Sequence, residues 1–130
     1  KMLRWTGVVL VSLALTACMM PQPTSAVRNQ AAEPLVCEGE QQCAVYWQRA
    51  YDWMVLNTVW KVEDVTDNTM RTVMPMDGSD ERGFEVRRVP AGEGREELVL
   101  RTHCDGYAWV CNTSDTAAIA SLKQYVRAVD

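Results

Sequence analysis

The 130-residue sequence is poor in the residues that build common catalytic and metal sites. It has a single histidine, His103, and five cysteines. It contains no Gly-rich phosphate loop before a helical pattern, no Gly-x-Ser-x-Gly and no His-Glu-x-x-His motif. Acidic residues outnumber basic ones by 17 to 13. This balance argues against a sequence-independent nucleic-acid binder, which needs a positive surface.

The sequence also lacks an apolar run long enough to span a membrane. The run from Trp5 to Ala17 covers about 13 residues, whereas a helix across the hydrocarbon core needs roughly 20. Lys1 and Arg4 precede this run and small residues end it. A basic start, an apolar centre and a small-residue end are typical of a secretory signal peptide. We therefore expect residues 1–17 to be removed during export.

The four residues Leu15-Thr16-Ala17-Cys18 make this signal more specific. They resemble the lipobox of bacterial lipoproteins, which is Leu, a small or hydroxyl residue, Ala or Gly, and then Cys. The resemblance implies cleavage by signal peptidase II before Cys18 and lipidation of Cys18, and two or more acyl chains hold a protein stably on a membrane. Met19 rather than Asp follows, which by the same resemblance favours the outer membrane. The alternative is a secreted protein that is cut after Ala17 and carries Cys18 as a plain thiol.

The rest of the chain divides into two parts. Residues 18–36 are predicted to form a lipidated flexible tether, because Met19 to Pro34 is rich in Pro, Gln, Ser and Ala and has no hydrophobic periodicity. Such a tether would hold the domain roughly 20 to 50 Å from the bilayer. Residues 37–130 are predicted to form one small periplasmic domain with a single core.

Two kinds of periodicity predict the architecture of that domain. Apolar side chains recur at helical spacing over 42–57 and again after Thr113 or Ser114, either of which suits an N-cap. Four segments between them alternate or are rich in strand formers, namely 58–66, 69–74, 84–89 and 98–103. Sequential strands with short connections usually pair with their neighbours. We therefore predict an α+β two-layer sandwich made of a helix, a four-stranded antiparallel meander and a helix.

Four cysteines remain once Cys18 is assigned to lipid, and an exported protein keeps disulfides. In the predicted meander the start of the first helix and the end of the fourth strand lie at opposite ends of the sheet. We therefore expect the local disulfides Cys37–Cys43 and Cys104–Cys111. The alternative is a zinc site, but zinc ligand pairs usually have two to four residues between them, whereas these pairs have five and six. We predict no metal and no cofactor.

The titratable residues do not form a catalytic set. His103 adjoins Cys104, but neighbouring residues of a strand point to opposite faces, so the two are poorly placed as base and nucleophile. A surface position is expected for His103. Asp77, Asp80 and Glu81 lack the ligand order of an EF-hand and are interpreted as solvated turn charges. We predict no catalytic residue and no enzyme activity.

Tyr107 and Trp109 are the candidate binding residues. Both lie between Cys104 and Cys111, where a crosslink would hold large side chains in place at low ordering cost. Ordered Tyr and Trp side chains are typical anchors of binding surfaces. The alternative is that Trp109 folds back onto the sheet and completes the core, with Tyr107 the more exposed of the two.

These observations predict a periplasm-facing, outer-membrane-anchored lipoprotein that acts as a non-enzymatic protein-binding module. Its expected partners are the membrane, through lipid on Cys18, and another envelope protein. An immunity or inhibitor lipoprotein and an envelope-assembly accessory are specific forms of this hypothesis. One alternative is a peptidoglycan- or sugar-binding module that uses Trp109. A hydrolase is a third hypothesis, and it would need a pocket in which His103 meets a carboxylate.

Overall fold

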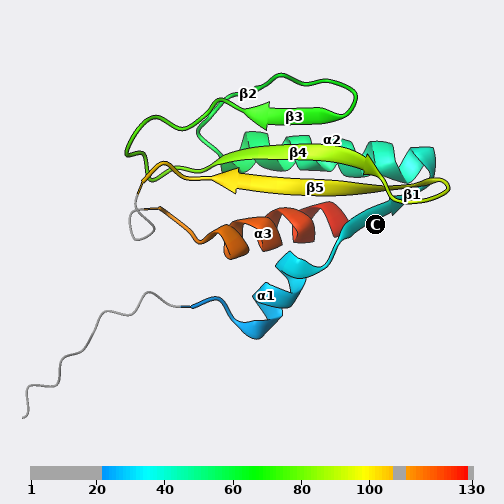
Figure 1. Ribbon diagram of the computed structural model, residues 1–130, viewed down its shortest axis with the longest axis horizontal. Coiled ribbons are helices and arrows are strands. Elements are labelled where there is room, and N and C mark those ends of the chain that lie inside the picture. Colours follow the sequence, from blue (N-terminus) through cyan, green and yellow to red (C-terminus); the bar gives the residue numbers. More distant parts are fainter. Residues whose placement is uncertain (1–21, 107–110, 129–130) are drawn as a thin grey trace, which may run out of the picture.

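The computed structural model describes residues 22–106 and 111–128. This part of the chain contains three helices and one five-stranded antiparallel sheet (Figure 1). The α+β class is thus confirmed, with one helix and one strand more than predicted. The elements are α1 (Ser25–Ala32), β1 (Leu35–Glu38), α2 (Gly39–Asn57), β2 (Val62–Glu63), β3 (Thr69–Thr72), β4 (Gly83–Pro90), β5 (Arg95–His103) and α3 (Asp115–Arg127).

The strand order of the sheet is β1-β5-β4-β3-β2. The four strands after α2 pair in chain order, and β1 extends the sheet at the β5 edge. The first predicted strand, 58–66, is reduced to the two residues of β2. It ends before Asp64, whose φ of 50° is left-handed and does not continue a strand.

One face of the sheet packs against α2 and α3 and forms the core. Met70, Val86 and Leu98 point from neighbouring strands into this core and are at most 1% exposed. The alternating residues lie on the opposite face, where Arg71 and Arg101 are exposed. The predicted helix faces are confirmed, because both helices contribute buried residues to the same cluster: Cys43, Ala50, Trp53 and Met54 from α2, with Ala118, Leu122 and Val126 from α3.

The turn from β1 into α2 shows why the domain begins earlier than predicted. Gly39 has a φ of 78°, a conformation that favours glycine, and its N–H donates to the Gly94 carbonyl at 2.6 Å. The Cys37–Cys43 disulfide joins β1 to the first turn of α2, with Cα atoms 5.1 Å apart. β1 therefore pairs in the sheet and is also crosslinked to α2 near the start of that helix.

Within the stretch 18–36 predicted as a flexible tether, residues 25–32 form α1, and Leu35 and Val36 begin β1. Thr24 caps α1, because its Oγ1 accepts from the Val27 N–H at 3.3 Å. No α1 residue is fully buried, although Val27, Gln30 and Ala31 are half-buried. Lys123 of α3 also holds this helix, because its Nζ donates to the carbonyls of Ala31 and Glu33, both at 2.7 Å. Contacts with residues 90 or more positions away in the sequence help to hold α1 on the domain, and no local sequence pattern predicts them.

Figure 1 shows α1 lying along α3, with the start of α1 toward the end of the molecule where α3 begins and where β5 ends. Within the described ranges no helix is both long and apolar enough to cross a membrane.

Candidate binding platform

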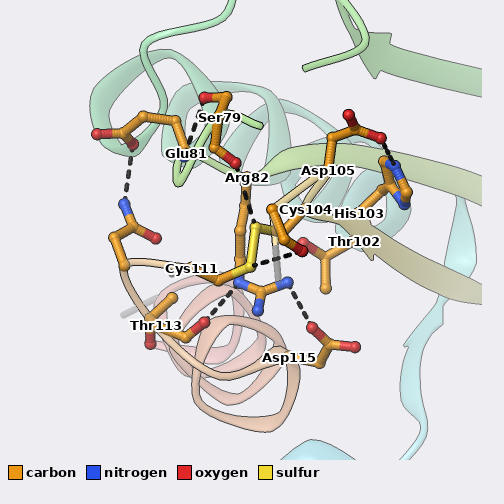
Figure 2. The surroundings of a disulfide bond; sticks show 12 residues. Ser79, Glu81, Arg82, Thr102, His103, Cys104, Asp105, Cys111, Thr113 and Asp115 are labelled. Carbon is orange, nitrogen blue, oxygen red and sulfur yellow. Dashed lines mark hydrogen bonds and ion pairs between the residues drawn. A yellow bond between two sulfur atoms is a disulfide. The ribbon is translucent and has the colours of Figure 1, made fainter. Parts of the chain in front are cut away.

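Two loops meet at the end of the sheet where β4 begins and β5 ends. The first is 76–82, between β3 and β4, and the second is the chain between β5 and α3, described at 104–106 and 111–114. We call these described residues the loop platform. The predicted disulfide Cys104–Cys111 is confirmed and closes the second loop, with Cα atoms 6.2 Å apart (Figure 2).

Hydrogen bonds tie the two loops together. The Gly78 N–H donates to Oδ2 of Asp105 at 3.2 Å. The backbone N–H of Asn112 donates to the Asp80 carbonyl at 2.9 Å, and its Nδ2 donates to Oε2 of Glu81 at 2.8 Å. Because the crosslinked loop is held at several points along 76–82, the loop platform is a preorganised surface rather than two independent loops.

Arg82 lies at the centre of the loop platform. Its side chain is 7% exposed, its Nε donates to the Thr113 carbonyl at 2.7 Å, and its guanidinium forms an ion pair with Asp115. A buried guanidinium is costly unless it is paired and hydrogen-bonded, and here both conditions hold. Asp115 is 68% exposed, so its carboxylate keeps its hydration while it pairs with Arg82. Figure 2 shows Arg82 reaching toward Thr113 and Asp115, which joins the start of β4 to the start of α3.

His103 and Cys104 do not form a catalytic pair. Cys104 is bonded to Cys111, so it has no free thiol. His103 is exposed, as predicted, and its Nε2 lies 3.5 Å from Oδ1 of Asp105 (Figure 2). Among the described residues, no hydroxyl or thiol is hydrogen-bonded to the imidazole of His103.

A cavity of about 200 Å³ lies beside the loop platform, between the end of α2, the start of β4 and the first turns of α3. The rings of Trp53 and Phe84 contribute to its wall and pack edge to face, with centroids 5.0 Å apart and an interplanar angle of 81°. Glu81 and Arg82 of the loop platform also line this cavity. Trp60 links the neighbouring segment to the same loop, because its Nε1 donates to the Glu81 carbonyl at 3.3 Å.

In the described part of the chain, one group of side chains resembles a metal site. Cys37, Cys43 and Glu96 place one ligand atom each within 4.8 Å of one another. The two sulfurs are joined in a disulfide, so they do not offer the thiolates that zinc requires while that bond is intact.

The structure places the four disulfide cysteines as predicted, whereas Cys18, Tyr107 and Trp109 lie outside the described residues. Sequence reasoning missed Arg82 and Asn112. Both are single polar residues within loop segments, and their roles depend on partners about 30 residues away. Comparisons with protein-family models, with curated proteins and with solved structures found no match. The function is therefore argued from the residues of this chain.

Proposed function

We propose that the chain is an outer-membrane lipoprotein that faces the periplasm and binds another envelope protein through the loop platform, without catalysing a reaction. The observation that carries the binding role is the preorganised platform. Its loops are joined by hydrogen bonds at Gly78, Asp80 and Glu81 and are closed by a disulfide. A surface that is ordered before binding loses less conformational entropy when a partner arrives.

The residues inside the crosslinked loop support a protein partner. Tyr107 and Trp109 lie in the sequence between Cys104 and Cys111. Tyr and Trp are enriched among the residues that dominate binding energy in protein interfaces. Cys104 is held in a disulfide, and His103 has no nucleophile hydrogen-bonded to it in the described residues. His103 lines one pocket with Glu85 and another with Asp115, as the hydrolase hypothesis requires. Without a nucleophile hydrogen-bonded to His103 among the described residues, we still favour binding over catalysis.

The cellular location of the protein is proposed from the lipobox resemblance at Leu15 to Cys18. Two disulfides agree with an oxidising compartment such as the periplasm. Because α1 is docked on α3, the connection from Cys18 to α1 consists of residues 18–24. A fully extended chain spans about 3.5 Å per residue, so this connection reaches roughly 25 Å at most. We therefore expect the domain to stay close to the bilayer.

The lipid anchor is tested by labelling cells with a radioactive fatty acid and following the protein through membrane fractionation. Wild type should carry label and sediment with the outer membrane, whereas Cys18→Ser should carry none. Cys37→Ser is the matched control, because it removes a cysteine without touching the lipobox and should keep the label. Label on the Cys18→Ser variant would refute the anchor.

The binding role is tested by affinity capture from solubilised envelopes, with wild type compared to Trp109→Ala and Tyr107→Ala. Wild type should retain a defined protein, and each variant should retain at least tenfold less, which corresponds to about 1.4 kcal/mol of lost binding energy. Tyr51→Ala is the control, because Tyr51 is a 37% exposed aromatic residue on α2, outside the loop platform. Equal capture by all four proteins would contradict a platform-mediated interaction.

Isolated peptidoglycan provides the second arm of this test. The proposal predicts that wild type does not co-sediment with peptidoglycan above the level of Trp109→Ala. Co-sedimentation that Trp109→Ala abolishes would replace protein binding with sugar binding as the function.

A further inference from the structure

The cavity beside the loop platform is large enough to admit one side chain of a partner. Its volume of about 200 Å³ is several times the roughly 30 Å³ that one water molecule occupies in the liquid. Part of its wall is aromatic, from Trp53 and Phe84, which are each 6% exposed. Aromatic rings attract cations through the negative potential of their faces, and Trp does so most strongly.

Several polar atoms of the lining residues are acceptors, although the hydroxyls of Thr113 and Ser121 and the indole N–H of Trp53 can also donate. Asn57 uses its Nδ2 to donate to the Trp53 carbonyl at 2.9 Å, and Asn112 uses its Nδ2 to donate to Glu81 at 2.8 Å. In the described chain, no donor is hydrogen-bonded to either amide oxygen or to Oε1 of Glu81. The residues lining the cavity thus keep three side-chain oxygens for a ligand that donates hydrogen bonds.

The helix ends at the cavity favour the same charge. α2 ends at Asn57, which lines the cavity, and has no basic residue in its last turn to offset the negative end of its dipole. The positive end of α3 is already satisfied, because Ser114 accepts from the Ala117 N–H and Asp115 lies in the first turn. A cation in the cavity would therefore lie near a helix C-terminus that has no basic side chain in its last turn.

Among the described residues that line the cavity, Arg82 is the only basic one, and its charge is already paired. Its guanidinium bonds to the Thr113 carbonyl and to Asp115. An anionic ligand would have to compete with Asp115 for Arg82 while lying near the carboxylate of Glu81. The lining therefore selects against anions.

We propose that this cavity receives a cationic side chain, the guanidinium of an arginine or the ammonium of a lysine, from the envelope protein that the loop platform binds. Glu81 is the charge partner, the oxygens of Asn57 and Asn112 accept hydrogen bonds, and Trp53 with Phe84 forms the apolar wall. The identity of the ligand as part of a protein rests on the proposed function. The selectivity of the cavity for a cation rests on the lining alone.

Nuclear magnetic resonance titration of the full-chain protein in detergent micelles tests this selectivity. The probe is N-acetyl-arginine amide, and its control is N-acetyl-citrulline amide, which has nearly the same shape and no charge. The arginine probe should shift the indole signal of Trp53 and the side-chain amide signals of Asn57 and Asn112. These shifts should level off as the probe concentration rises. The citrulline probe should bind at least tenfold more weakly. Equal shifts with both probes, or none with either, would overturn the inference.

Two variants test the same site independently. Glu81→Gln should weaken arginine binding about tenfold, whereas Glu93→Gln, an exposed carboxylate in the turn at the far end of β4, should leave it unchanged. Ala117→Met keeps a good helix former on α3 and fills the cavity, so it should abolish the shifts, while Ala44→Met on the exposed side of α2 should not. Unchanged arginine affinity in both Glu81→Gln and Ala117→Met, with every variant folded, would overturn the inference.

The two proposals fail differently. If envelope capture succeeds but the arginine probe moves no cavity signal, the cation site is wrong and protein binding stands. If the arginine probe binds selectively but no envelope protein is captured, the cation site stands and the proposed function is wrong.

Discussion

Replacing Lys123 by methionine tests how α1 is held on the domain. The Nζ of Lys123 donates to the Ala31 and Glu33 carbonyls, and the residue is only 8% exposed. No residue of α1 is fully buried, and these bonds add to the half-burial of Val27 and Ala31. Hydrogen bonds to a charged group contribute about 1.5 to 3 kcal/mol each, but the burial of the ammonium offsets part of this gain. Arg127 also still donates to the Glu33 carbonyl in the variant. We therefore expect Lys123→Met to weaken the docking of α1 by about 2 kcal/mol.

Hydrogen exchange of the α1 amides is the assay, because it reports local opening rather than global unfolding. A loss of about 2 kcal/mol corresponds to roughly 30-fold faster exchange in α1. Amides of β4 and β5 should keep most of their protection, because Lys123 is not bonded to either strand. Lys61→Met is the matched control, since Lys61 is exposed and should leave α1 unaffected. Unchanged exchange of the α1 amides in Lys123→Met would refute this account of how α1 is held.

The pH dependence provides a second check on Lys123. Burial, followed by repulsion from Arg127, lowers the pKa of Lys123 in the folded chain. Between that lowered pKa and the roughly 10.4 of an unfolded lysine, the unfolded chain binds more protons, so the free energy of unfolding rises with pH. Wild type should therefore gain stability relative to Lys123→Met as the pH rises through this window in urea denaturation. A relative loss would contradict the sign.

Three further tests probe the loop platform and the residues next to it by urea denaturation. Asp115→Ala should destabilise more than Arg82→Met, by about 3 against 2 kcal/mol, because it leaves a buried guanidinium unpaired while the reverse leaves a solvated carboxylate; the opposite order would contradict the role given to Arg82. Replacing Cys104 and Cys111 together by serine should cost about 2 kcal/mol on the chain-entropy model, and a reductant should therefore destabilise wild type, which loses both disulfides, more than the variant, which loses only Cys37–Cys43. Gly83→Ala should cost about 1 to 3 kcal/mol, because its Cβ would lie 2.9 Å from a ring carbon of Pro75; a neutral effect would show that this contact relaxes freely.

The sequence by itself determined the features that depend on local repetition. The stripes of α2 and α3 mark the buried faces, because each helix needs one apolar side to join a core. The local disulfides followed from an exported chain whose helix starts and strand ends lie at opposite ends of a sheet. Alternation located β4 and β5, although the structure extends β5 back to Arg95.

Only the tertiary structure decided the features that depend on single polar contacts between distant segments. α1 lacks a buried stripe, so its docking is visible only once Lys123 is found at the carbonyls of Ala31 and Glu33. Arg82 looks like one more loop charge until Thr113 and Asp115 enclose it. Apolar residues recur at regular spacing along the chain, so their pattern can be recognised from the sequence alone. A hydrogen bond between residues 30 or 90 positions apart leaves no such repeat, so the cavity and the loop platform emerge only when the strands and helices are brought together.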